Sequence, residues 1–144
     1  MNRGLKRPES VLVVIYTAGR EVLLMDRVQP PGYWQSVTGS LHTGETPFAA
    51  AIREVREETG LEVEQGLVDC GYSNRFEILP AWRSRYPATE RWNTEYVYRV
   101  RLPRKVSITC NQREHAQARW FSVAEALGKV GSRANREAIE RYVC

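Results

Sequence analysis

Three glutamates lie close together near the middle of the chain: Glu54, Glu57 and Glu58, in the segment REVREETG. Residues three and four apart are neighbours on a helix surface, and like charges at that spacing destabilise an isolated helix by about 0.2 to 0.5 kcal/mol per pair. Two interpretations account for such a cluster. It is either a solvated acidic face, eased by Arg53 and Arg56, or a set of hard oxygen ligands for Mg²⁺ or Mn²⁺. Taken alone, the three residues favour the solvated face.

The segment that carries the glutamates has the signals of a helix from 47 to 59. Thr46 offers a hydroxyl N-cap, Pro47 suits the first helical position, and Gly60 supplies the stop. At about 100° per residue the mostly apolar side chains form one stripe, which we expect to pack on a sheet. This stripe consists of Phe48, Ala51, Ile52, Val55 and Thr59. The three glutamates fall together on a flank of that stripe.

Residues on both sides of the cluster decide between the two interpretations. The 23 residues from Gly39 to Leu61 match the signature of the Nudix hydrolase family at every fixed position. The matching residues are Gly39, Glu45, Arg53-Glu54-Val55, Glu57-Glu58 and Gly60-Leu61. Nine fixed positions at fixed spacing form a specific pattern, so the chain resembles a Nudix hydrolase. The resemblance implies a single Nudix domain over residues 1–144, with the signature at 39–61.

The resemblance implies a fold, a reaction and a metal. The fold is of the α/β class, an α/β/α sandwich with a mixed β-sheet between helices. The reaction is hydrolysis of a nucleoside diphosphate linked to another group. Mg²⁺, with Mn²⁺ as the alternative, would neutralise the phosphates and lower the pKa of a bound water that attacks phosphorus. The implied metal ligands are Glu54, Glu57, Glu58 and, from a loop outside the signature, Glu114.

The same resemblance assigns supporting and catalytic roles. Arg53 orients a glutamate, Glu45 supports the loop through hydrogen bonds or contacts behind the metal ligands, and Gly39 permits a close backbone approach. Glu57 is a further metal ligand or the general base, and Glu114 is an additional ligand or base. An exposed loop glutamate is the other interpretation of Glu114.

Segments outside the signature resemble the bacterial Nudix hydrolases that act on dihydroneopterin triphosphate in folate synthesis. They are KRPESVLVVIY (6–16), YWQSVTGS (33–40), RFEIL (75–79), NTE (93–95), EH (114–115) and SRANREAIE (132–140). This second resemblance implies release of pyrophosphate and the monophosphate. It also implies substrate-binding residues, namely Lys6, Arg27, Thr38, Phe76, Glu77, Ile78, Leu79 and Ser132.

Five of these substrate residues have a plain structural alternative. Lys6 and Arg27 suit phosphate groups but also suit a solvated surface. Phe76 suits a flat heterocycle or the core. Thr38 and Ser132 offer hydroxyl partners, or they fill a strand position and cap a helix.

Two other functions stay open. One is a nucleotide-pool hydrolase that acts on ordinary or oxidised deoxynucleoside triphosphates, because pterin and guanine share an aminopyrimidinone edge. The other is a non-catalytic module that binds a nucleotide or RNA. Such modules usually lose a glutamate of the signature, and this chain keeps them all.

The elements that must position these residues follow from local patterns. Strands are expected at 9–17 and 21–27, joined as a hairpin, and at 33–39, before a loop that runs to Glu45. Strand character returns at 61–78, 94–102 and 118–122, and one or two helices are expected within 122–143. Strands and helices mixed in this way predict a sheet covered by helices on both sides.

The segment 79–93 alternates arginines with aromatic residues: Trp82, Arg83, Arg85, Tyr86, Arg91 and Trp92. Such a pattern suits stacking of single-stranded nucleic acid, a loop near the triphosphate, or a cover for the sheet. The net charge of +4 is modest and no recognised nucleic-acid motif is present, so we do not expect nucleic acid as a partner.

Composition sets the remaining bounds. A chain of 144 residues fits one domain, and a positive charge favours an anionic partner, here a small-molecule triphosphate. Three scattered cysteines suggest reduced thiols, and no apolar run has the length of a membrane span. We therefore expect a cytoplasmic protein without a membrane partner. The sequence leaves its oligomeric state open.

Overall fold

A mixed sheet of seven strands runs through the computed structural model, which describes residues 5–28, 32–109 and 115–143. The strands are β1 (Glu9–Thr17), β2 (Glu21–Arg27), β3 (Trp34–Gln35), β4 (Val37–Ser40), β5 (Leu67–Glu77), β6 (Trp92–Leu102) and β7 (His115–Ser122). Their order is β3-β2-β1-β6-β5, with β4 beside β1 and β7 beside β2. The helices are α1 (Pro47–Thr59), α2 (Val123–Lys129), α3 (Arg133–Tyr142) and a 3₁₀ helix, η1 (Pro80–Arg85).

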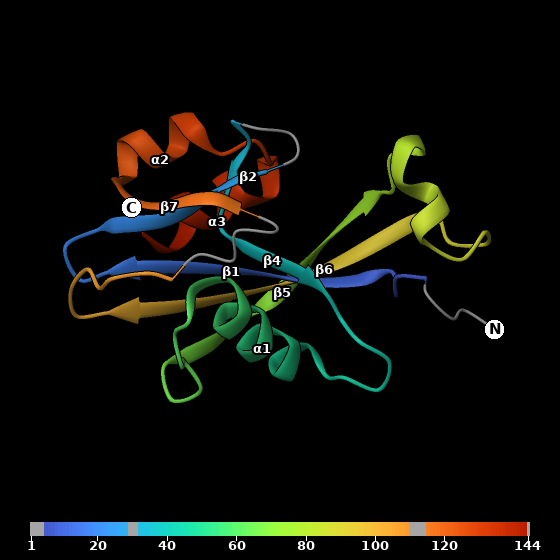
Figure 1. Ribbon diagram of the computed structural model, residues 1–144, viewed down its shortest axis with the longest axis horizontal. Helices are drawn as coiled ribbons and strands as arrows, with labels where there is room; N and C mark the ends of the chain where they lie inside the picture. Colours follow the sequence, from blue (N-terminus) through green and yellow to red (C-terminus); the bar gives the residue numbers. More distant parts are fainter. Residues whose placement is uncertain (1–4, 29–31, 110–114, 144) are drawn as a thin grey trace.

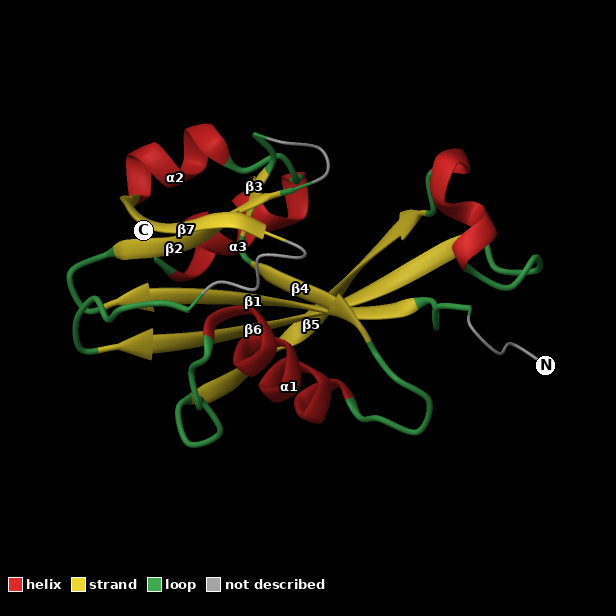
Figure 2. Ribbon diagram, in the orientation of Figure 1, coloured by secondary structure: helices red, strands yellow, loops and turns green. Residues whose placement is uncertain are grey.

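Helices cover both faces of the sheet, α1 on one side and α2 with α3 on the other (Figures 1 and 2). Two separate apolar clusters reflect these layers. One includes Ala51 and Val55 of α1, and the other includes Ala126 of α2 and Ile139 of α3. The predicted α/β/α sandwich with a mixed sheet is confirmed.

Strand β1 lies at the centre because its side chains are buried on both faces. It pairs in parallel with β6 from Glu9↔Thr94 to Thr17↔Leu102, and antiparallel with β4. Side chains alternate along a strand, so Val11, Val13 and Ile15 pack toward α1 while Leu12, Val14 and Tyr16 pack toward α2 and α3. A continuous apolar run is what two covered faces require.

Helix α1 begins and ends where the sequence predicts. Thr46 Oγ1 accepts a hydrogen bond from the Ala49 N–H at 3.2 Å, and Gly60 ends the helix with a φ of 79°. The predicted face needs a correction. Glu54 and Glu58 lie on the buried side of the helix, whereas Phe48 lies at its rim with 38% of its surface exposed.

Several strand predictions also need correction. β1 and β2 meet only near Tyr16↔Val22, and β2 pairs mainly with β7, which starts at His115 rather than 118. The strand expected at 33–39 is split into β3 and β4. Residues 61–66 form no strand, because the N–H groups of Gly66 and Leu67 both bond the Val63 carbonyl in a turn. Helix η1 occupies part of the expected loop at 79–93.

No helix in the described ranges is long and apolar enough to cross a membrane.

Candidate active site

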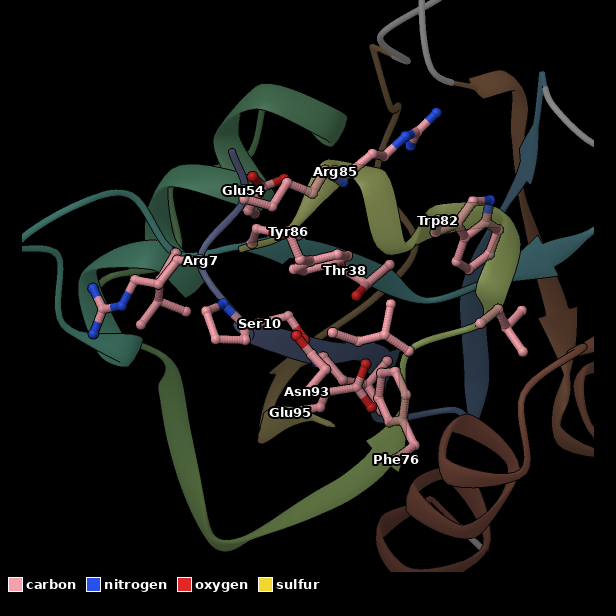
Figure 3. Close-up of a pocket in the computed structure, with 18 of the residues that line it drawn as sticks. Arg7, Ser10, Thr38, Glu54, Phe76, Trp82, Arg85, Tyr86, Asn93 and Glu95 are labelled. Atoms are coloured by element: carbon pink, nitrogen blue, oxygen red, sulfur yellow. The ribbon is translucent and has the colours of Figure 1, made fainter. Parts of the chain in front are cut away.

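A cavity of about 1580 Å³ lies between β4, β5, β6, η1 and the start of α3 (Figure 3). All eight predicted substrate residues line it: Lys6, Arg27, Thr38, Phe76, Glu77, Ile78, Leu79 and Ser132. Glu54 of α1 lines it as well. The cavity therefore joins residues that are far apart in the sequence to the helix that carries the acidic cluster.

Arg53 connects the acidic cluster to the loop before α1. Its Nη1 donates to Glu54 Oε1 at 2.7 Å and to Glu57 Oε2 at 3.2 Å. Its Nε and Nη2 donate to the two carboxylate oxygens of Glu45 at 2.8 and 2.9 Å, and Nη2 also reaches the Ser40 carbonyl at 2.9 Å. These contacts agree with the orienting position that the resemblance implies for Arg53.

Glu45 anchors the loop from the other side. Its Oε1 accepts from the His42 N–H at 2.8 Å, and the Arg7 guanidinium donates to the carbonyls of His42 and Glu45 at 2.9 and 3.0 Å. The hydrogen bond from Arg53, together with the His42 N–H and the Arg53 charge, lowers the pKa of Glu45 to about 2 even though burial opposes the shift. Glu45 is thus held as a carboxylate that fixes the loop.

The three glutamates of the cluster differ in environment. Glu54 is 8% exposed and Glu58 is 0% exposed, whereas half of the Glu57 side chain reaches solvent. A Cβ atom at Gly39 would overlap the Glu54 carboxylate, so this glycine is what lets the carboxylate lie against β4. The close approach predicted at Gly39 is therefore made by a side chain of α1.

Aromatic side chains line the opposite end of the cavity. Phe76 and Trp82 both line it and are 43% and 39% exposed, so their rings are accessible to a ligand. The Arg27 guanidinium lies over the rings of Tyr33 and Trp82, 5.7 and 5.8 Å from their centroids. Of the three roles open for the segment 79–93, its place in the lining of the cavity favours that of a loop near the triphosphate.

Ser132 is both the N-cap of α3 and a lining residue. Its Oγ accepts from the Asn135 N–H at 3.2 Å. The buried Asn135 side chain in turn accepts from the Ser36 N–H at 2.8 Å and donates to Ser36 Oγ at 2.9 Å. These bonds fix the start of α3 to the connection between β3 and β4.

The other predicted substrate residues have mixed surroundings. The Lys6 backbone N–H donates to the Arg85 carbonyl, which joins the N-terminal segment to η1. Glu77 is exposed and pairs with Arg91 at 3.1 Å. Ile78 is buried, and the neighbouring Leu79 is exposed where η1 begins.

The model of the NUDIX domain family matches residues 6–142. The chain belongs to the Nudix family. This Nudix protein is 40% identical to the dihydroneopterin triphosphate diphosphatase of Escherichia coli K12 over 142 residues, 96% of this chain and 93% of the relative. It is 36% identical to the Haemophilus influenzae protein of the same name, covering 96% of this chain and 89% of the relative. The predicted family is confirmed.

A solved structure agrees with these relatives. The structure of the E. coli dihydroneopterin triphosphate pyrophosphohydrolase matches this Nudix protein with a TM-score of 0.88 and 41% identity. The match covers 96% of this chain and 97% of that one. The hydrolase class expected from the signature is confirmed with the family.

Nudix hydrolases generally depend on divalent metals, and the donor set of α1 fits one. It offers carboxylate groups, whose oxygens hard cations prefer, and it holds two of them, those of Glu54 and Glu58, on the buried face of the helix that also carries Ala51 and Val55. Within the described ranges no three acidic, histidine or cysteine side chains are already arranged around one metal position, and Arg53 holds Glu54 and Glu57. Glu114, the further predicted ligand, lies outside the described residues.

Sequence reasoning missed one buried acid in the cavity of this Nudix protein. Glu95 of β6 lines it and is only 8% exposed. Burial raises the pKa of Glu95 to about 7, while a side-chain hydrogen bond with Thr38 acts in the opposite direction. The NTE segment at 93–95 is part of the second resemblance. The signal that could have found Glu95 is its position in a strand, two residues before Val97 and therefore on the same buried face.

Proposed function

We propose that this Nudix hydrolase converts 7,8-dihydroneopterin triphosphate to dihydroneopterin monophosphate and pyrophosphate. One observation carries the proposal: a single cavity extends from Glu54 on the acidic helix to the exposed aromatic groups Phe76 and Trp82. A triphosphate joined to a flat ring needs both ends. The names and the 40% and 36% identities of the two relatives support the same substrate.

We assign the metal end of the cavity to Glu54, Glu57 and Glu58, with Glu114 as a further ligand. Bound Mg²⁺, or Mn²⁺ in its place, would offset the phosphate charge and lower the pKa of a water molecule. Arg53 keeps Glu54 and Glu57 oriented through its two short contacts. Glu57 is the most exposed of the three, which suits a group that exchanges protons with water.

The reaction breaks the bridge between the first two phosphates. The water oxygen bonds to one phosphorus of that bridge, the bond from this phosphorus to the bridging oxygen breaks, and the group on the other side of the bridge leaves with the electron pair. The proton of the water passes to a carboxylate, with Glu57 or Glu114 as the proposed base. Lys6 and Arg27 are proposed to hold the phosphates and Phe76 the ring, with Thr38, Glu77, Ile78, Leu79 and Ser132 completing the substrate pocket.

A nucleoside triphosphate is the second candidate substrate, because the exposed rings of Phe76 and Trp82 accept a purine as well as a pterin. In either case we propose a small molecule rather than nucleic acid or a membrane surface as the partner, and action in the cytoplasm. The gathering of lining residues from several elements around one cavity supports a small ligand.

Product analysis tests the proposal. With Mg²⁺ present, dihydroneopterin triphosphate is expected to give equal amounts of monophosphate and pyrophosphate. Glu57→Gln and Glu58→Gln are expected to lower kcat at least 100-fold, while Glu62→Gln, whose side chain is exposed and pairs with Arg56, keeps full activity. Release of single phosphates, or unchanged turnover in Glu57→Gln and Glu58→Gln, contradicts it. No turnover of any triphosphate favours a non-catalytic module.

A further inference from the structure

Glu95 lies on the same face of the sheet as the groups that would surround a ring. Residues directly opposite on neighbouring strands share a face, and the register pairs Ser10 with Glu95, Asn74 with Glu95, and Phe76 with Asn93. Thr38, opposite Leu12, lies on this face too. Figure 3 shows the Glu95 carboxylate beside Phe76 and Asn93, with Thr38 above it.

The surroundings of Glu95 are neutral. Thr38 shares a hydrogen bond with its side chain, and nearby the Asn93 Nδ2 donates to Ser10 Oγ at 2.8 Å. None of the ion pairs between described residues includes Glu95. A buried carboxylate without a cation is costly to keep, so its presence in a ligand cavity points to a ligand that supplies hydrogen-bond donors.

A carboxylate has two acceptor oxygens side by side, and this geometry matches two adjacent N–H donors. The aminopyrimidinone edge of a pterin presents such donors, the ring N–H and the exocyclic amine. We propose that Glu95 accepts both hydrogen bonds and so selects the heterocycle, with Phe76 packed against the ring. This inference rests on the proposed function and names the residue that reads its substrate.

Binding of two donors stabilises the charged carboxylate. The pKa of free Glu95, near 7, leaves the group about half ionised at neutral pH, and the ligand then favours the ionised form. Adenine presents one donor beside an acceptor nitrogen on the corresponding edge, so it satisfies one carboxylate oxygen and repels the other. Sites built around such paired groups discriminate strongly against ligands that lack them.

The test compares two substrates in two enzymes. The quantity is the ratio of kcat/KM for dihydroneopterin triphosphate to kcat/KM for dATP under the same Mg²⁺ concentration. In Glu95→Gln an amide NH₂ replaces one carboxylate oxygen and so faces the pterin donors, whereas it matches the acceptor nitrogen of adenine. The ratio is therefore expected to fall at least tenfold, while the dATP value does not fall. Glu21→Gln, on β2 and paired with Lys105 away from the cavity, should leave the ratio unchanged. A smaller fall, or an equal loss with both substrates, overturns the proposal.

A binding measurement without metal separates recognition from catalysis. Neopterin, followed by its own fluorescence in EDTA, is expected to bind Glu95→Gln at least tenfold more weakly than the wild type. Equal affinities overturn the proposal. If Glu95→Gln does not fold, Glu95→Asp keeps the charge but withdraws it by one methylene, and its substrate ratio should fall at least threefold; a smaller fall overturns the proposal.

These outcomes remain distinct from a failure of the proposed function. Turnover of dihydroneopterin triphosphate by the wild type tests that function alone, and the effect of Glu95→Gln on neopterin binding tests recognition alone. A wild type that binds neopterin through Glu95 but does not hydrolyse the triphosphate would overturn the function and keep this inference.

Discussion

Gly39 shows how one missing side chain positions a functional group. Its place in β4 brings the backbone against the Glu54 carboxylate, and any Cβ there would overlap that carboxylate. Its φ does not lie in the left-handed region, so the requirement for glycine comes from space rather than from backbone conformation. The first fixed residue of the signature and the first glutamate of the cluster are therefore parts of one contact.

We predict that Gly39→Ala lowers kcat/KM at least tenfold because Glu54 must move away from β4. Overpacking of this kind also costs about 1 to 3 kcal/mol of stability. Gly128→Ala is the matched control, since a Cβ there meets nothing within 4 Å and alanine favours its helix. Activity assays and urea unfolding check both variants. An active Gly39→Ala enzyme would contradict the role assigned to this contact.

Glu95 should make stability depend on pH. Its folded pKa of about 7 lies above the ordinary 4.5, so its contribution is complete below pH 4.5 and is lost as the pH rises through about 7. At about 1.4 kcal/mol per pH unit, the loss approaches about 3 kcal/mol. We expect the free energy of unfolding of the wild type to fall by this amount relative to Glu95→Gln between pH 4.5 and 8. Parallel curves for the two proteins in urea unfolding would contradict it.

At the residue scale, the sequence predicted the grouping of the signature residues and the residues that line the cavity, but it missed Glu95. Gly39, Glu45 and Arg53 are close in the chain and reappear as one network, because a helix and its preceding loop obey local rules. Glu95 could not be assigned a role in this way. Its surroundings depend on strand register, which places Ser10 and Asn74 beside it. These two residues lie 85 and 21 positions earlier in the chain.

Among the elements, α3 is anchored at its start by a buried asparagine. Asn135 makes two hydrogen bonds to Ser36, and just before the helix the Gly131 N–H donates to the Trp34 carbonyl at 3.2 Å. The same helix start presents Ser132 to the cavity. We therefore expect Asn135 to affect both stability and substrate binding.

We predict that Asn135→Ala lowers the free energy of unfolding by about 2 to 4 kcal/mol, because the Ser36 N–H and hydroxyl lose their buried partner. KM should rise more than kcat falls, since Ser132 moves with the helix. Glu137→Ala, on the exposed side of α3, serves as the control and should change stability by less than about 0.5 kcal/mol. Urea unfolding and steady-state kinetics measure both effects, and a wild-type KM in Asn135→Ala would refute the coupling.

Element predictions were right where the deciding information was local. The caps at Thr46 and Gly60 fixed α1, and the apolar run of β1 indicated its central place. The hairpin predicted between 9–17 and 21–27 forms only next to the turn, at Tyr16↔Val22. Most residues of β2 pair with β7, about 100 residues later in the chain. The apolar stripe of α1 was also misjudged at Phe48, which is 38% exposed, and at Glu58, which is fully buried. The usual rule of burial fails most often at functional residues, which is the role proposed for Glu58.

The whole molecule brings two chemistries together across one sheet. The side chains of α1 pack on the face lined by Val11 and Val13, whereas Thr38 and Glu95 lie on the face of α3. The cavity at the edge of β4 reaches both, and it lies beside Gly39, where no side chain separates them. The proposed metal-binding helix and the proposed heterocycle pocket are thus both within reach of one extended substrate.

The most direct test is a comparison of kcat/KM for dihydroneopterin triphosphate, dATP, dGTP and 8-oxo-dGTP under identical Mg²⁺. The account predicts the highest value for dihydroneopterin triphosphate, with an advantage of at least tenfold over dATP, which corresponds to about 1.4 kcal/mol of transition-state stabilisation. A preference of tenfold or more for 8-oxo-dGTP would contradict it and assign the cavity to oxidised nucleotides.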